Sequence, residues 1–535
     1  MKTMISSIIL ASCLALPLAS CSDSDVAPEQ KDWSTTTYFY SADAAMQDTY
    51  YKPTVGYVGD PMPFFDPVAG DFKVLYLQDF RPNPEGTYHP IWGVSTKDAA
   101  HYTSLGELVS CGTKKSQDAA IGTGSTIYDE ASKLYYTFYT GNKYLPTGDE
   151  SAQAVMVATS PDFKTWTKDR TFLLKGQDFG YDKNDFRDPF VFKGDDGKFH
   201  MLISTKKGGK GSLAEFVSDD LKNWTDNGVF MTMMWDRFYE CPDLFKMGDY
   251  WYLVYSEIHH AVRRVQYFKG RTLDELKACT ANDAGIWPDA HEGFLDSRGL
   301  YAGKTASDGT NRYLWGWCPT RSGKDNTAVG ASPAEPEWGG NLVCYKLIQH
   351  EDGTLTLGQI DAVSEKYNQD VAVEVKESQN MTEADGTYTL AGSVEQPDAY
   401  MLIGRLGSHN KISFTVTTSN EWDKFGISMV RGSDSKKYYT MVVNPENENN
   451  RKVNFEEQGV EGKGFIAGID GYVFARPADN VYNITIYTDN SICVMYINDV
   501  CSYTNRIYGI QKNCWSINSY NGANVKISNL KISQY

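Results

Sequence analysis

The sequence predicts an all-β protein, a five-bladed β-propeller followed by a C-terminal β-sandwich. Three observations support this fold class. Apolar strand pairs recur at similar steps, helical periodicity is scarce, and the last third of the chain alternates apolar and polar residues over short runs. With 535 residues, the chain is also too long for a single core of ordinary size, so at least two domains are expected.

The recurring unit is a short apolar strand, a polar turn and a second strand rich in Tyr, Leu, Val or Trp. It occurs as Asp60–Phe80, Ser125–Gly141, Asp185–Thr205, Glu240–Ser256 and Leu300–Trp317. Equivalent points are 63, 64, 53 and 60 residues apart, at Phe65, Tyr128, Phe192, Phe245 and Thr305. Strand-rich repeats of this length are typical of propeller blades, so five units predict five blades. An irregular β-sandwich, the alternative, explains neither the count nor the step.

The chain divides into five expected segments. They are a signal peptide (1–20), a polar tether (21–36), the propeller (37–350), a linker (351–370) and the sandwich (371–535). The sandwich is predicted from short alternating strands separated by Gly, Asn and Asp turns. We expect it to brace the propeller, although its residues leave sugar binding open.

The N-terminus has the features of an export signal, because Lys2 precedes the apolar run Met4–Leu18, which is too short to span a membrane. The stretch Leu18–Cys21, LASC, resembles a bacterial lipoprotein cleavage box, with Cys21 as the lipidated first residue of the mature protein. A plain secretory signal is the alternative. We expect a monomer held by lipid alone at the cell envelope, in the bacterial outer membrane. The sequence leaves open on which face of that membrane the protein lies.

Composition disfavours several function classes. The net charge of -17 argues against nucleic-acid binding, because a phosphate backbone needs a basic surface. The cysteines form neither a CxxC pair nor a Cys/His cluster with zinc spacing, so we expect no metal site and no cofactor. The aromatic content of 13% suits the flat, weakly polar faces of sugars.

Three acids stand at comparable positions in three units. Asp60, Asp188 and Glu240 each lie four or five residues before the apolar reference point of their unit. Because the starts of the innermost propeller strands line one end of the central channel, we expect these side chains to converge. Proline follows each acid within two residues and fixes the backbone there. The alternative is that the acids only accept backbone amides as turn caps.

Converging carboxylates in a sugar-sized pocket point to glycoside cleavage. One ionised acid attacks the anomeric carbon or activates water, while a second, with a pKa raised by burial and by its charged neighbour, protonates the leaving oxygen. A third acid can hold substrate hydroxyls and stabilise positive charge on the ring.

The motifs around these acids are similar to those of a known family. The motifs are Asp60-Pro61, Arg187-Asp188-Pro189 and Glu240-Cys241-Pro242-Asp243, together with LYLQDF, IWGVST, GSTIYD and FLDSRGLYAGKT…RYLWGW. In this order they resemble glycoside hydrolase family 32, the invertases, inulinases and levanases, over residues 37–535.

The resemblance implies a five-bladed propeller with a sandwich, retaining hydrolysis of β-fructofuranosides and no metal. It implies that Asp60 is the nucleophile, that Glu240 is the acid/base, and that Asp188 binds fructose hydroxyls and stabilises the transition state. The further substrate-site residues that it implies are Arg187, which orients the acids, and Gln78, Trp92, Ser125 and Tyr301, the last beside Glu240.

One departure concerns the substrate. The family motif Trp-Met-Asn-Asp-Pro-Asn-Gly is replaced here by Tyr57–Pro63, YVGDPMP, which lacks both asparagines. The sequence therefore predicts a fructan hydrolase but leaves levan, inulin and sucrose open, with a fructan favoured. Two alternatives remain: an inverting arabinan or xylan hydrolase similar to family 43, and a lipoprotein that captures fructan without cleaving it.

Overall fold

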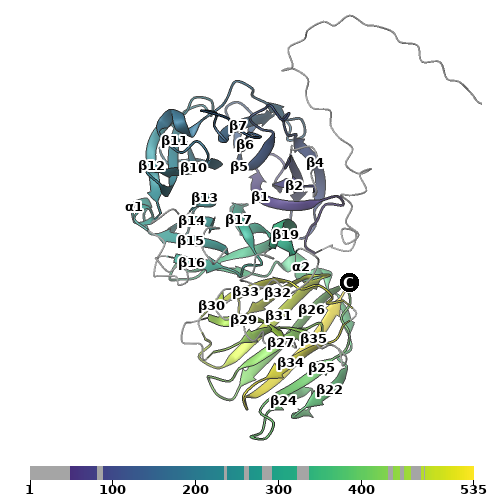
Figure 1. The fold of residues 1–535 in the computed structure, drawn as a ribbon. Helices are drawn as coiled ribbons and strands as arrows, with labels where there is room; N and C mark the ends of the chain where they lie inside the picture. The colour runs from purple at the N-terminus through teal and green to yellow at the C-terminus, as the bar shows by residue number, and fades with distance from the viewer. Residues whose placement is uncertain are drawn as a thin grey trace, which may run out of the picture.

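The protein consists of two β-domains, shown in Figure 1 as a ring of blades above a sandwich. The structure is a computed structural model. It describes residues 49–80, 88–233, 238–257, 264–279, 292–321, 336–431, 438–445, 451–458, 472–474, 476–511 and 513–535. The expected signal peptide, the polar tether and Cys21 lie outside these residues. In the described part, no helix is long and apolar enough to cross a membrane.

The first domain is a propeller of five four-stranded antiparallel blades. Blade 1 contains β1 (Tyr57–Asp66), β2 (Asp71–Asp79), β3 (Ile91–Thr96) and β4 (Thr103–Val109). Blade 2 contains β5 (Ala120–Asp129), β6 (Leu134–Asn142), β7 (Gln153–Ser160) and β8 (Thr167–Lys168). Blade 3 contains β9 (Phe186–Lys193), β10 (Phe199–Lys207), β11 (Lys210–Ser218) and β12 (Thr225–Thr232).

The last two blades follow the same order. Blade 4 contains β13 (Glu240–Met247), β14 (Tyr250–Glu257), β15 (Arg264–Gly270) and β16 (Glu292–Leu295). Blade 5 contains β17 (Tyr301–Ser307), β18 (Arg312–Arg321), β19 (Pro336–Gln349) and β20 (Leu355–Gly358). The short helices η4 (Gly176–Phe179) and α1 (Leu273–Lys277) lie in connections. Each blade comes from one continuous segment, and the ring closes where Val58 of β1 pairs with Gly340 of β19.

The boundary of the propeller differs from the sequence expectation in one place. Strand β20 falls within the expected linker 351–370, yet it pairs with β19 and completes blade 5. The four-residue strand follows a turn at Gly353, which has a positive φ of 78°. Its brevity gives little periodic signal in the sequence. Helix α2 (Asp361–Lys366) then leads to the second domain.

The second domain is a sandwich of two antiparallel sheets. One sheet contains β21 (Gln369–Val371), β23 (Met381–Ala384), β24 (Thr387–Ala391), β26 (His409–Thr418), β31 (Val481–Asp489), β32 (Ile492–Ile497), β33 (Cys501–Arg506) and β35 (Asn524–Gln534). The other contains β22 (Val375–Gln379), β25 (Ala399–Ile403), β27 (Phe425–Met429), β28 (Tyr438–Val443), β29 (Arg451–Gln458), β30 (Tyr472–Val473) and β34 (Trp515–Ser519). Together the two domains confirm the predicted fold class.

Apolar side chains between neighbouring blades form the propeller core. Phe138 of blade 2 and Met201 of blade 3 belong to one buried cluster, and Leu202 of blade 3 and Leu253 of blade 4 belong to the next. Successive side chains of a strand point to opposite faces, so each inner strand packs against both neighbouring blades. This packing fixes the starts of the innermost strands around a common centre.

Buried polar contacts join the two domains. Arg506 of β33 donates through Nη2 to the carbonyl of Cys318 and to Oδ1 of Asn341, both at 2.7 Å. Asp296, just after β16, accepts from the backbone N–H of Thr504 at 2.7 Å and from its hydroxyl at 2.6 Å. Figure 1 shows the sandwich against the propeller, with the C-terminus at the junction near α2. These contacts are consistent with a bracing role.

Candidate active site

A β-bulge interrupts the innermost strand of four blades at the same point. Two residues of the inner strand oppose one residue of its neighbour at Asp60-Pro61, Asp188-Pro189, Cys241-Pro242 and Ala302-Gly303. The first residue of each pair has a positive φ, between 36° and 58°. Such a conformation costs a residue with a Cβ about 1–3 kcal/mol, and strain of this kind gathers at functional sites.

The bulges correct the alignment of the three acids. Asp60 and Asp188 are the first residues of their bulges, but the equivalent residue in blade 4 is Cys241. Glu240 therefore precedes its bulge by one residue, as Arg187 and Tyr301 precede theirs. Aligning the repeat units in the sequence missed this offset, because the spacing from an acid to a distant apolar residue cannot locate a bulge. As a result, Glu240 faces Arg187 and Tyr301 and is not a third copy of the aspartates.

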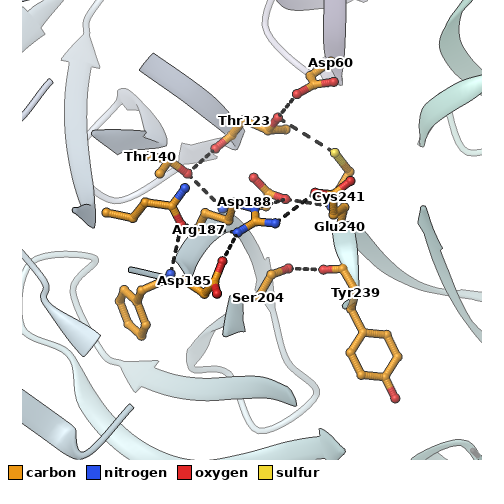
Figure 2. Close-up of polar contacts among 12 residues, drawn as sticks. Asp60, Thr123, Thr140, Asp185, Arg187, Asp188, Ser204, Tyr239, Glu240 and Cys241 are labelled. Carbon is orange, nitrogen blue, oxygen red and sulfur yellow. Dashed lines mark hydrogen bonds and ion pairs between the residues drawn. The ribbon is translucent and has the colours of Figure 1, made fainter. Parts of the chain in front are cut away.

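Asp60 is partly buried where blades 1, 2 and 5 meet. Thr123 of β5 donates its hydroxyl to Oδ2 at 2.7 Å, and the Trp317 indole of β18 donates to Oδ1 at 3.1 Å. Burial raises the pKa of Asp60 to about 6, and the charges of Asp188 and Glu240 add to this effect, while both hydrogen bonds oppose it. Figure 2 shows the contact between Asp60 and Thr123.

Asp188 is held from both neighbouring blades. Its carboxylate accepts the backbone N–H of Cys241 at 2.9 Å, and its own N–H donates to the Thr140 hydroxyl at 2.9 Å. Thr140 in turn donates to the carbonyl of Thr123 at 2.9 Å, so these two threonines connect Asp188 to Asp60 (Figure 2). Burial raises the pKa of Asp188, Arg187 lowers it, and Glu240 raises it further.

Glu240 is held by two side chains from other blades. Arg187 Nη2 lies 2.9 Å from its Oε1, and the Tyr301 hydroxyl donates to its Oε2. Arg187 also contacts Asp185 at 2.7 Å, and its guanidinium lies 3.9 Å from the centre of the Phe238 ring. Burial lowers the pKa of Arg187, but Glu240 and Asp188 raise it more, so this side chain stays charged.

The other expected substrate residues lie at different depths. Gln78 is fully buried, and its amide donates to the carbonyl of Val55. Ser125 is 7% exposed; its hydroxyl donates to the Pro189 carbonyl at 2.9 Å and accepts the Val191 N–H at 2.8 Å. Ser125 thus connects blades 2 and 3 beside Asp188. Trp92 is partly buried, with its ring 5.8 Å from that of Phe80.

An aromatic stack occupies the space beside the altered motif. A Cβ on Gly59 would come within 2.2 Å of the Trp338 ring, so only glycine fits here. Trp338 stacks on His89 with centroids 3.9 Å apart and lies 5.8 Å from Trp317, the donor to Asp60. No pattern in the sequence indicates this arrangement, because Trp338 is far from Gly59 along the chain and meets it only when the ring closes.

The arrangement can support acid–base and nucleophilic chemistry. One carboxyl group, that of Asp60, is partly buried with side-chain donors and a raised pKa, while another, that of Glu240, is held by a cation and a phenol. Different environments are what separate the roles of paired carboxylates. Within the described ranges, no group of three or more His, Cys, Asp or Glu side chains could hold a metal ion.

Family models match nearly all of the described chain. "Glycosyl hydrolases family 32 N-terminal domain" matches residues 50–360, and "GH32, BT1760-like, C-terminal domain" matches residues 353–532. Among curated proteins, "Beta-fructofuranosidase, insoluble isoenzyme CWINV2" of Arabidopsis thaliana is 26% identical over 310 residues, which cover 52% of this chain and 50% of that protein. "Fructan 6-exohydrolase" of Beta vulgaris is 25% identical over 287 residues, covering 50% and 46%.

Solved structures extend the likeness to both domains. The exo-inulinase from Aspergillus awamori superposes with a TM-score of 0.67 at 15% sequence identity, over 91% of this chain and 98% of that chain. This likeness concerns the fold. The chain spans about half the length of the curated relatives it matches.

Proposed function

The chain belongs to glycoside hydrolase family 32, and on this premise we propose that it hydrolyses β-fructofuranosidic bonds of fructans with retention of configuration. The observation that carries the proposal is the placement of Asp60, Asp188 and Glu240 at or directly before the bulges of three inner strands, where Arg187 next to Asp188 reaches Glu240 and Cys241 next to Glu240 donates to Asp188. Two-step hydrolysis needs a nucleophile and a separate acid/base on one sugar ring.

In the first step, the Asp60 carboxylate attacks the anomeric carbon while Glu240 gives its proton to the leaving oxygen. The bond to the leaving group breaks, and a fructosyl ester forms at Asp60. In the second step, Glu240 takes a proton from water, which attacks the same carbon and frees Asp60. Arg187 and Tyr301 hold Glu240 in place, and Asp188 binds fructose hydroxyls as positive charge develops on the ring.

Two observations support a fructan over sucrose as the substrate. Relatives acting on fructans by name include the fructan 6-exohydrolase of Beta vulgaris and the fructan 1-exohydrolase IIa of Cichorium intybus. Gly59 makes room for the partly buried Trp338 ring, which lies 5.8 Å from the Trp317 ring, and partly exposed aromatic rings suit the apolar faces of sugars. We therefore propose levan or inulin as the preferred substrate.

The proposal is tested by incubating the purified protein separately with levan, inulin and sucrose and sizing the products. We expect fructose or fructo-oligosaccharides from a fructan at a higher kcat/KM than from sucrose. Arabinan and xylan serve as controls. Cleavage of these polymers alone would favour the family 43-like alternative, and binding of fructan without cleavage would favour a capture protein.

Export and lipid anchoring at Cys21 are a separate proposal, supported by the LASC box. We propose a monomer on a bacterial outer membrane. The test is fractionation of cells that express the Cys21→Ala variant. The wild-type protein should remain with the membrane fraction, while the variant should not. Equal membrane association of the two would contradict lipid anchoring.

A further inference from the structure

A buried hydroxyl group connects the surroundings of the two aspartates. Thr140 of β6 is fully buried, and its side chain hydrogen-bonds to backbone groups of two other strands. It accepts the N–H of Asp188 in β9 and donates to the carbonyl of Thr123 in β5, both at 2.9 Å. Thr123 donates its own hydroxyl to Asp60 (Figure 2). One hydroxyl group therefore joins the strand of Asp188 to the residue that holds Asp60.

Both backbone groups belong to residues that a β-bulge removes from the regular strand pairing. Asp188 is the first residue of the bulge in β9. In β5, the pairing with β6 moves from Gly122 to Gly124, so Thr123 is an extra residue there. A bulge leaves its extra residue unpaired, and a buried backbone group without a partner is costly. The Thr140 hydroxyl satisfies one such group in each of two blades.

A second set of contacts links the same two residues through blade 4. The backbone N–H of Cys241 donates to the Asp188 carboxylate at 2.9 Å, and the Cys241 thiol lies 3.8 Å from the Thr123 hydroxyl (Figure 2). A thiol is a weak hydrogen-bonding group, whereas the two hydrogen bonds of Thr140 have ordinary lengths. The Thr140 hydroxyl is therefore the stronger of the two links between Thr123 and Asp188.

We propose that Thr140 is a positioning residue, whose hydroxyl holds the bulges of β5 and β9 together and so fixes Asp60 and Asp188 relative to each other. The inference rests on the proposed function, in which Asp60 attacks the anomeric carbon and Asp188 binds fructose hydroxyls. Both carboxylates have to meet one sugar ring, and a displacement of about 1 Å can lower a rate by about a hundredfold. Thr140 acts through the backbone of the bulges.

Two substitutions separate the hydroxyl from the shape of the side chain. Thr140→Val keeps the shape but can neither accept from Asp188 nor donate to Thr123, while Thr140→Ser keeps both hydrogen bonds. In Thr140→Val, we expect kcat on levan or inulin to fall by roughly one to two powers of ten, with KM changed by less than about threefold, because the loss falls on the transition state. Thr140→Ser should keep kcat within about threefold of the wild type.

Thr137→Val is the matched control. Thr137 is a fully buried threonine of the same strand, and its hydroxyl contacts that of Thr126 at 2.8 Å. Both valine variants should lose some thermal stability, since each leaves a buried hydrogen-bond partner behind. Only Thr140→Val should also lose turnover per folded molecule. An equal loss of kcat in the two variants would reveal a structural effect alone and would overturn the inference.

Unchanged kcat in a folded Thr140→Val protein, or a large loss of kcat in Thr140→Ser, would also overturn it. If Thr140→Val does not fold, Thr140→Cys takes its place, because a thiol is a weaker donor and acceptor. Wild-type kcat in that variant would contradict the inference. The proposed function fails differently: a wild-type protein that cleaves no fructan, or near-normal turnover of Asp60→Asn, would refute it whatever the Thr140 variants do.

Discussion

Buried or partly buried carboxylates occur at the bulges of the inner propeller strands and at the domain junction, and the two regions use them differently. At the junction, Asp296 accepts two hydrogen bonds from Thr504, and Asp489 accepts the backbone N–H groups of Thr49 and Tyr50 at 2.9 and 2.8 Å. At the bulge of β1, the hydrogen bonds that Asp60 accepts within the described residues come from side chains, and other carboxylates act on it. What sets Asp60 and Asp188 apart from the junction acids is the like charge of neighbouring carboxylates, since Asp188 also accepts a backbone N–H, from Cys241.

The largest expected effect is a loss of turnover when the proposed catalytic acids are replaced. Asp60→Asn and Glu240→Gln should each lower kcat by roughly four powers of ten, because both residues act on the chemical step, while substrate still binds. Steady-state kinetics and calorimetric titration with a fructo-oligosaccharide measure the two quantities. Near-normal turnover in either variant would refute the role of that residue.

At the junction, the opposite outcome is expected. Asp296→Ala leaves the N–H and hydroxyl of Thr504 without their acceptor, so the free energy of unfolding should fall by about 3 kcal/mol. The kcat of the folded fraction should stay near that of the wild type. Denaturant unfolding and active-site titration check this pair of results. A large loss of kcat with unchanged stability would contradict the comparison.

The raised pKa of Asp60 has a consequence for stability. Its pKa is about 6 in the folded protein and about 3.9 in an unfolded chain, so the folded state binds the proton more tightly. The ionised group therefore destabilises the fold above about pH 6, and this cost disappears as pH falls toward about 4. Asp60→Asn should be more stable than the wild type by about 3 kcal/mol near pH 7 and nearly equal to it near pH 4. Thermal unfolding across this range is the measurement, and a constant difference would contradict the assignment.

The smallest effect concerns the hydroxyl beside Asp60. Thr123→Val keeps the shape but removes the donor to Oδ2, so the pKa of Asp60 should rise by about one unit. The acid limb of kcat/KM should move upward with it, while turnover at high pH changes by less than about threefold. Thr126→Val, at a buried threonine that contacts Thr137, is the matched control.

The sequence predicted the blades because each hairpin carries its own periodic signal. The expectation that Asp60 and Asp188 converge came from the same hairpins, since each acid precedes a proline and an apolar run. The offset of Glu240, the depth of Gln78 and the contact of Trp338 with Gly59 were not predictable. Each depends on a bulge or on contact between distant blades, which leave no pattern in local sequence.

The acids at the domain junction show a second limit of prediction from sequence. Asp296 and Asp60 are both acids next to short apolar strands, and sequence alone does not tell a backbone-bound acid from a reactive one. The difference lies in the donors, which come from β33 in one case and from β5 and β18 in the other.

Carbon NMR of the sugar released first from levan or inulin, recorded before the anomers equilibrate, probes the double displacement at Asp60 without relying on any variant. Two successive inversions at the anomeric carbon deliver β-fructofuranose, and that is the signal we expect. Initial appearance of the α anomer would mean a single inversion and would contradict an ester intermediate on Asp60.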